Sequence, residues 1–496
     1  MNSGSSTGAD AFERLSSGIE GLDELLDGGF VAERTYMVRG TTGSGKTIVG
    51  LHFLLAGVDR GESSLLVSLE ESERQLRENA AALSLDPSGI EILDLSPDPE
   101  YFVEEESYDI FAADEVERAP LNREITEAVE RIDPDRVVID PVTQLRYLSA
   151  DEFQFRKQVL SFIEFLKERG TTVLFTSQSS QVSADDDLQF LSDGVIDLER
   201  SDQQRTVSVT KFRGSDFRSG RHSFRIGRGG LTVFPELIPG QYEREFVAEA
   251  IPSGVPEIDD LLNGGLERGT VTIISGPTGV GKTTLGSQFA NEAAGRGEHS
   301  AMYLFEEGVE TFVERTRAIG VPIEEMRERS TLHVEGVEPL QQSAQEFAQR
   351  VRSEVEAHDT EIVMIDGVEG YRLSLWDSDE GVTRRLHALC RYLKNMGVTV
   401  VLIDETQSVT GTFEPTSENL SYLADNIVFL RYLELQGELR KAIGVLKKRT
   451  SDYERTLREF EITESGIRVG DPLRGLRGIL RGEPEWVTPP GGEDRE

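Results

Sequence analysis

The stretch GTTGSGKT at residues 40–47 decides the fold, and a near copy, GPTGVGKT, occupies residues 276–283. Each stretch fits the pattern G-x-x-x-x-G-K-[ST], in which glycines let backbone amides turn inward and approach a phosphate closely. The lysine of such a loop reaches the β- and γ-phosphates of a nucleotide, and the hydroxyl residue coordinates magnesium. Because each match follows an apolar run and opens a helical pattern, the sequence predicts two ATP-binding loops.

The predicted ATP-binding residues lie within these two loops. They are Thr41, Thr42, Gly43, Ser44, Gly45, Lys46 and Thr47 in the first loop, and Pro277, Thr278, Gly279, Val280, Gly281, Lys282, Thr283 and Thr284 in the second. Lysine is rare in the chain, and its presence at the end of both loops indicates that a point charge is needed there.

The two loops belong to two copies of one longer unit. The stretch SGIEGLDELLDGGF at 17–30 recurs as SGVPEIDDLLNGGL at 253–266, and Lys282 follows Lys46 by 236 residues. Repetition over this length indicates a tandem duplication. We expect a flexible N-terminus at 1–11, a first domain at 12–238, a linker at 239–247, a second domain at 248–470 and a C-terminal tail at 471–496.

Apolar strands alternate with helical patterns inside each copy. In the first copy, TYMVRG, SSLLVSLEE, DRVVID and TTVLFTSQ fit buried strands, and KTIVGLHFLLAGVDRG and FRKQVLSFIEFLKERG fit amphipathic helices. This alternation is typical of right-handed βαβ units. The fold class we predict is α/β, with a mainly parallel sheet and helices on both of its faces in each copy.

Carboxylates follow the predicted strands where a nucleotide would need them. Asp140 and Asp366 end apolar strands downstream of the loops, and with Thr47 and Thr283 they are the predicted Mg²⁺ ligands. Two glutamate pairs, Glu70 with Glu71 and Glu306 with Glu307, end the strand after each loop helix and are candidates for the base that activates water. The sequence leaves open which member of each pair is the base.

The composition is strongly acidic, with 52 Lys and Arg against 90 Asp and Glu, a net charge of −38. Bulk attraction to nucleic acid or to an anionic membrane is therefore not expected. An acidic, lysine-poor surface is typical of a protein from a salty cytosol, so we expect a halophilic source and a cytoplasmic location. No apolar run approaches the ~18 residues of a membrane span.

The order of motifs, GGF, GTTGSGKT, LEES, VVID and KFRG, resembles the KaiC family of circadian clock ATPases, which have tandem RecA-type cores. Both copies match, including the run YLELQGELRKAIGVLKKRTSDYERTLREFEIT. The resemblance implies a hexameric ring with ATP at subunit boundaries, in which Lys211, Arg213, Lys447 and Arg449 reach the nucleotide of the adjacent subunit. Phe217 and Thr450 stand where the family usually has His and Gly.

The resemblance also implies autophosphorylation of the second copy on an adjacent Ser-Thr pair. Alignment of the following strand places Ser421 at the Ser and Tyr422 at the Thr, and Thr416 is a second candidate acceptor. Gln189 occupies the corresponding position of the first copy when Asp193 is aligned with Asp425. Regulatory partners are expected to bind the tail at 471–496.

The function we expect is that of an ATP-hydrolysing regulatory ring. One alternative is a DNA-dependent ATPase of the RecA/RadA type, because RecA cores also serve recombination. We find no basic stripe and no cluster of Lys and Arg with interleaved aromatics to support it. Another alternative is a nucleotide-gated scaffold with little turnover, which the full set of carboxylates opposes.

Overall fold

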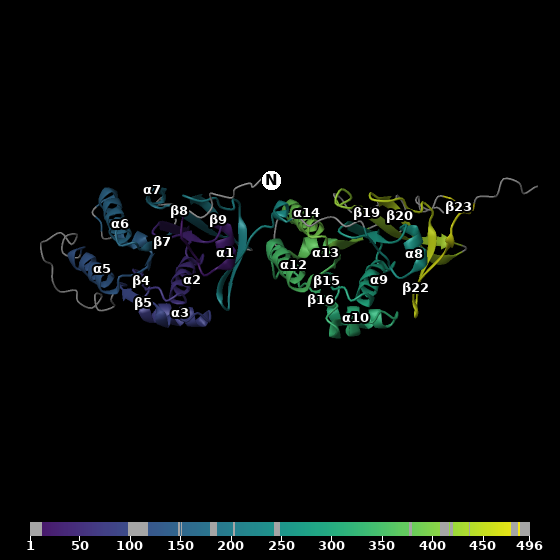
Figure 1. Cartoon of the computed structure of the whole chain (residues 1–496), viewed down its shortest axis with the longest axis horizontal. Helices are drawn as coiled ribbons and strands as arrows, with labels where there is room; N and C mark the ends of the chain where they lie inside the picture. The colour runs from purple at the N-terminus through teal and green to yellow at the C-terminus, as the bar shows by residue number, and fades with distance from the viewer. Residues whose placement is uncertain are drawn as a thin grey trace, which may run out of the picture. The chain divides into compact units, whose positions relative to one another are not determined.

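The computed structural model describes residues 12–97, 118–146, 149, 151–178, 186–201, 204–242, 249–375, 379–406, 416, 420–435, 437–477 and 485–486. The chain divides into two compact units, and the division falls between Glu236 and Leu237. Each unit is built around one nine-stranded sheet (Figure 1). The predicted α/β class with tandem, mostly parallel sheets is confirmed.

The first unit has the strand order β11-β10-β9-β8-β3-β7-β6-β4-β5. From β8 to β5 all neighbours are parallel, whereas β8 to β11 form an antiparallel extension. The strands are β3 (Thr35–Gly40), β4 (Ser64–Ser68), β5 (Glu91–Asp94), β6 (Arg136–Asp140), β7 (Thr172–Gln178), β8 (Gly194–Arg200), β9 (Arg205–Phe212), β10 (His222–Gly227) and β11 (Gly230–Phe234).

Helices cover both faces of this sheet, and consecutive residues of its central strands, which point to opposite faces, are buried almost throughout. Tyr36 and Val38 of β3 pack with the core of α2, whereas Met37 packs with that of α6. Figure 1 shows α2 on one side of the strands and α5 and α6 on the other. The helices are α1 (Glu20–Leu25), α2 (Lys46–Val58), α3 (Glu73–Ala82), α5 (Arg118–Ile132), α6 (Glu152–Lys167) and α7 (Asp186–Leu191).

The second unit repeats this arrangement in the order β16-β15-β17-β18-β14-β19-β20-β21-β22. Its strands are β14 (Val271–Gly276), β15 (Ser300–Leu304), β16 (Leu332–Gly336), β17 (Ile362–Asp366), β18 (Thr399–Glu405), β19 (Asn426–Leu435), β20 (Glu438–Lys448), β21 (Arg458–Thr463) and β22 (Gly466–Pro472). Its helices are α8 (Pro256–Leu261), α9 (Lys282–Gly295), α10 (Val309–Arg317), α11 (Ile323–Glu328), α12 (Ala344–His358), α13 (Val368–Ser374) and α14 (Asp379–Asn395).

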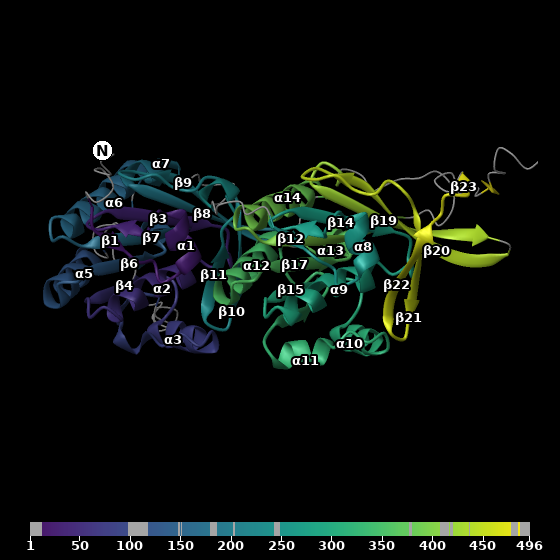
Figure 2. The ribbon, with the colours of Figure 1, turned by 45° about the vertical axis from the view of Figure 1, so that its right-hand side comes forward.

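Strands β19 and β20 form a long antiparallel pair, visible in Figure 2, that pairs Asn426 with Lys448 at one end and Leu435 with Glu438 at the other. Short two-stranded ribbons join β1 (Arg14–Leu15) to β2 (Phe30–Val31), β12 (Ala250–Ile251) to β13 (Leu266–Glu267), and β23 (Leu476–Arg477) to β24 (Glu485–Trp486). None of the helices in the described residues is long and apolar enough to cross a membrane.

The topology brings the predicted site residues to one edge of each sheet. Strands β3, β4, β6 and β7 are parallel, so the residues that follow or end them meet at the carboxyl edge. The first glycine-rich loop follows β3, the glutamate pair follows β4 and Asp140 ends β6. The second unit has the same arrangement, with Asp366 at the end of β17.

Candidate functional site

Both glycine-rich loops join a central strand to the first turn of a long helix. Gly45, at the N-cap of α2, has φ 107°, and Gly281, at the N-cap of α9, has φ 116°, in the left-handed region that favours glycine. A Cβ on Gly45 would lie 2.9 Å from Cδ1 of Ile226, so a side chain here would also require Ile226 of β10 to shift. The loop therefore holds its backbone next to the N-terminus of a helix, a location that favours anions.

The two loop lysines are buried and bind their own loops. Lys46 Nζ donates to the carbonyl oxygens of Gly40 at 3.0 Å and Thr41 at 3.1 Å, and Lys282 Nζ donates to that of Pro277 at 3.0 Å. Burial lowers the pKa of both ammonium groups, and nearby carboxylates oppose this shift. Each ammonium is thus a poorly hydrated cation beside the loop, which favours its pairing with phosphate oxygens.

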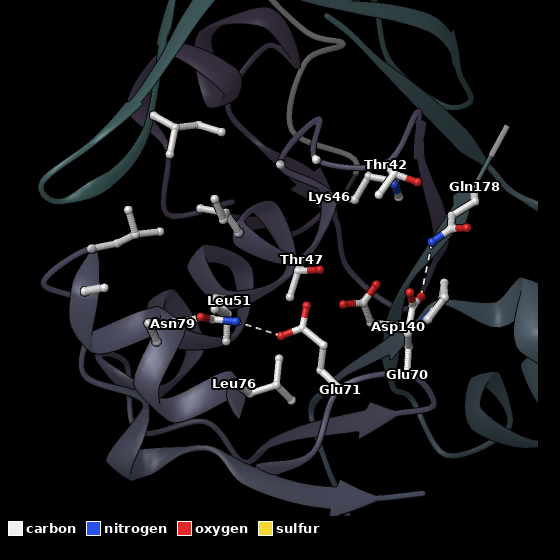
Figure 3. Close-up of a pocket in the computed structure, with 18 residues that line it drawn as sticks. Thr42, Lys46, Thr47, Leu51, Glu70, Glu71, Leu76, Asn79, Asp140 and Gln178 are labelled. Carbon is white, nitrogen blue, oxygen red and sulfur yellow. Dashed lines mark hydrogen bonds between the residues drawn. The ribbon is translucent and has the colours of Figure 1, made fainter. Parts of the chain in front are cut away.

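A pocket of about 420 Å³ in the first unit joins a polar end to an apolar end. Figure 3 shows the hydroxyl of Thr47 and the carboxylates of Glu70, Glu71 and Asp140 pointing toward a common space. The polar lining also includes Thr42, Gly43, Gly45, Lys46, Asn79 and Gln178, and the apolar lining includes Ile48, Leu51, Leu76, Ala80, Ala82, Leu83, Pro141 and Ile226. The polar end suits phosphates and a metal ion, and the apolar end suits a planar base.

The strand-end aspartates are buried and bind a hydroxyl in each unit. Thr176 Oγ1 of β7 donates to Asp140, whereas Thr283 Oγ1 of the loop itself donates to Asp366 Oδ1 at 3.0 Å. Burial raises the pKa of Asp366 to about 7, and Glu307 and Glu306 add to this increase. Burial thus disfavours the charged form of Asp366, and a cation bound beside this carboxylate would favour the charged form again.

The glutamates of the first pair have different partners. Gln178 Nε2, at the end of β7, donates to Glu70 Oε2 at 3.1 Å, and Asn79 Nδ2 of α3 donates to Glu71 Oε2 at 2.9 Å. Glu70 is also one of the two carboxylates whose charge acts on Lys46. The first glutamate is therefore associated with the lysine that would reach the γ-phosphate, and the second with the helix.

The second pair lies in a more charged environment. Arg315 of α10 binds Glu307 as an ion pair and lies 3.4 Å from the hydroxyl of Thr284. Reduced hydration raises the pKa of Glu306, and the negative charge of Glu405 raises it further, while Lys282 lowers it. Arg315 and Glu405 replace the neutral Asn79 and Gln178 of the first unit.

The cations predicted to act across a subunit boundary bind away from the glycine-rich loop of their own copy. Lys211 Nζ donates to the carbonyl oxygens of Gln189 at 2.7 Å and Ser192 at 2.6 Å, and Arg213 lies 3.6 Å from Asp193. In the second unit Lys447 Nζ donates to the carbonyl oxygens of Ser421 at 2.9 Å and Ala424 at 2.7 Å. Arg449 lies 3.5 Å from Asp425. Their action on a neighbouring subunit stays a prediction.

These lysine contacts place Gln189 and Ser421 at corresponding positions. Ser421 and Tyr422 are both exposed, in a turn before β19, and Thr416 is half-buried. The structure provides a hydroxyl at this position in the second unit and an amide in the first. Residues 413–415 and 417–419 of the predicted acceptor segment lie outside the described residues, as do 1–11, part of the linker, and most of the tail.

Other predicted loop residues serve the loop itself. The side chain of Val280 is buried in the core, so only its backbone remains for a ligand, and the backbone amide of Ser44 donates to the carbonyl of Thr41 at 3.2 Å. Four residues beside the loops, Asn79, Gln178, Arg315 and Glu405, were not predicted from the sequence. Gln178 and Glu405 end the strand beside the loop strand, and Asn79 and Arg315 each lie eight residues after the glutamate that they bind, on the helix that follows it, which was the available signal.

Comparison with known proteins gives a consistent match over both units. A family model of the KaiC ATPase matches the chain twice, over residues 15–238 and 251–474. The circadian clock protein KaiC3 of Synechocystis sp. is 28% identical over 495 residues, which cover 97% of this chain and 96% of the relative. The circadian clock oscillator protein KaiC of Parasynechococcus marenigrum is 27% identical over 96% of this chain and 94% of the relative. The circadian clock oscillator protein KaiC of Picosynechococcus sp. is 28% identical over 96% of this chain and 93% of the relative.

Proposed function

The chain belongs to the KaiC family of ATPases, and on this premise we propose that each unit binds and hydrolyses ATP as part of a regulatory ring. The observation that carries this proposal is the pocket of the first unit. A phosphate-binding loop, a buried lysine, a strand-end aspartate and two glutamates line it together with an apolar end. The second unit has a counterpart of each polar group.

The polar groups divide the work of phosphoryl transfer to water. The loop amides and Lys46 would hold the phosphates and offset the charge that develops on the γ-phosphate. We propose that Glu70 is the base that orients and deprotonates water, because its charge acts on Lys46 while Glu71 binds Asn79. By the same criterion Glu306 is the base of the second unit, since its charge acts on Lys282.

The hydroxyl and carboxylate pairs fit a magnesium ion. Mg²⁺ prefers hard oxygen ligands and is commonly held by one or two carboxylates together with substrate phosphates. Such oxygens are supplied by Thr47 with Asp140 in the first unit and by Thr283 with Asp366 in the second. Thr283 Oγ1 lies 3.0 Å from Asp366 Oδ1. The described residues contain no group of three or more His, Cys, Asp or Glu that could hold a metal. When bound, Mg²⁺ would supply charge neutralisation between the phosphates.

Assembly and further activities are part of the proposal. We propose a homo-hexameric ring in which Lys211, Arg213, Lys447 and Arg449 reach the ATP of the next subunit. The action of these cations on the next subunit is supported by the exposure of Arg213 and Arg449, whose side chains are 58% and 51% exposed.

We also propose autophosphorylation of the second unit, on Ser421 or Thr416, and binding of regulatory proteins to the tail at 471–496.

The test is a count of ATP bound per chain by equilibrium dialysis with Mg²⁺. The unaltered chain should bind two, and Lys46→Ala or Lys282→Ala should each bind one, because the remaining site is chemically complete. Released phosphate should fall in both variants. A variant that still binds two would contradict the assignment of its loop, and an unaltered chain that binds none would contradict the function.

A further inference from the structure

Glu405 is the last residue of β18, the strand that lies beside the loop strand β14 and pairs Glu405 with Gly276. Its carboxylate contacts the second glycine-rich loop in two places. Thr278 Oγ1 donates to Oε1, and Lys282 Nζ lies 3.9 Å from Oε2. Burial lowers the pKa of Lys282, and of the nearby carboxylates that oppose this shift Glu405 has the largest effect. The carboxylate therefore lies beside the ammonium that would bind the phosphates of ATP.

The first unit has an amide at the same place. Gln178 is the last residue of β7 and pairs with Gly40, as Glu405 pairs with Gly276. Its side chain donates to Glu70, and Lys46 donates, among the described residues, to the carbonyl oxygens of Gly40 and Thr41. The strand-end residue of the first unit thus holds the proposed base, whereas that of the second unit binds the loop and repels Glu306.

We propose, building on the ATP-binding function, that Glu405 is an affinity-setting residue that competes with the phosphates of ATP for Lys282 and Thr278. A phosphate that binds Lys282 must either displace this carboxylate or accept a like charge next to it, and both cost free energy. The second site then binds ATP more weakly than the first because it has the carboxylate of Glu405 where the first site has the amide of Gln178. The two otherwise similar loops acquire different occupancies at the same ATP concentration.

Single-site chains test this inference. Lys46→Ala leaves the second site, and Lys282→Ala leaves the first, so that binding of radiolabelled ATP with Mg²⁺ reports one site at a time. In the Lys46→Ala chain, Glu405→Gln should lower the Kd for ATP roughly tenfold, as expected for removal of one partly screened like charge. In the Lys282→Ala chain, the reciprocal change Gln178→Glu should raise the Kd by a similar factor.

The matched control is Glu464→Gln, which removes one negative charge from an exposed turn of the same unit. It should leave the Kd unchanged, which separates a local effect from a change in net charge. An equal or higher Kd in Glu405→Gln, while the second site still binds ATP, would overturn the inference and leave the proposed function intact. Absence of ATP binding in both single-site chains would instead overturn the proposed function.

Discussion

Glu70 and Glu71 are adjacent in the sequence, yet their carboxylates bind different elements. Glu70 binds Gln178 at the end of β7, and Glu71 binds Asn79 on α3. A base for ATP hydrolysis must lie near the γ-phosphate, and the charge of Glu70 acts on the lysine that would bind it. Glu71 is instead part of the contact that positions α3 against the pocket.

A pair of amide substitutions separates these two roles. Glu70→Gln should lower phosphate release on the order of 10²- to 10⁴-fold, the usual effect of losing a general base, while ATP remains bound. Glu71→Gln keeps an oxygen that can accept from Asn79, so a loss below about tenfold is expected. Both changes are measured in the Lys282→Ala chain, so that only the first site turns over. A larger loss in Glu71→Gln would exchange the two roles.

The sequence predicted the residues whose identity is fixed by local backbone chemistry. The loop glycines and lysines could be recognised because one short segment contains the glycine and lysine pattern that is typical of phosphate-binding loops. Glu405 and Arg315 could not be recognised in this way, because Glu405 contacts residues more than 100 positions away and Arg315 contacts a glutamate that lies before its helix. The contacts of Glu405 depend on the order of the strands, which the sequence pattern does not specify.

The segment before the antiparallel extension has the same contacts in both units. A lysine on β9 or β20 binds two carbonyl oxygens of this segment, and an arginine just after the strand lies near its aspartate. The backbone contacts are the same in both units but the side chain differs, with an amide at Gln189 and a hydroxyl at Ser421, so only the second unit offers a hydroxyl at this position.

Phosphorylation of this segment is therefore expected in the second unit alone. After incubation with ATP and Mg²⁺, mass spectrometry of peptides should find phosphate on Ser421, because its side chain is exposed while its carbonyl is held by Lys447. Ser421→Ala should remove this modification, and Lys282→Ala should prevent it by removing the phosphoryl donor. Phosphate on Thr416 instead of Ser421 in the unaltered chain would show that Thr416 is the acceptor. An unmodified segment in a chain that hydrolyses ATP would contradict autophosphorylation.

At the scale of helices and strands, the α/β class and the parallel core were predictable because buried strands and amphipathic helices alternate along the chain. The predicted strand TYMVRG coincides with β3 (Thr35–Gly40), and DRVVID contains β6 (Arg136–Asp140). The four-stranded antiparallel extension of each sheet was not predicted in detail. Its strands carry mixed polar and apolar residues, which do not show their partners.

The whole molecule contains two similar sites, and we propose that the adjacent subunit supplies a lysine and an arginine to each of them. If Arg449 acts across a boundary, subunits with Arg449→Ala and subunits with Glu306→Gln should each have little turnover at the second site. A mixture should recover part of this turnover, because some boundaries then combine an intact Glu306 with an intact Arg449. All subunits carry Lys46→Ala to silence the first site. Lack of recovery in mixed rings of confirmed size would contradict the shared site.

The net charge of −38 belongs to the whole molecule and predicts a requirement for salt. Like charges on a compact chain repel one another, and this repulsion is relieved on unfolding, so it lowers stability. The Debye length falls from about 10 Å at 0.1 M salt to about 3 Å at 1 M, which screens most of this repulsion between exposed groups.

We therefore expect the Tm, followed by circular dichroism, to rise as KCl increases from 0.1 M to 2 M. NaCl should produce the same rise, because screening depends on ionic strength and not on the identity of the cation. A variant in which several exposed glutamates are replaced by glutamine should be more stable at 0.1 M KCl and respond less to added salt. A Tm that stays constant or falls over this range would show that the acidic surface is not an adaptation to a salty cytosol.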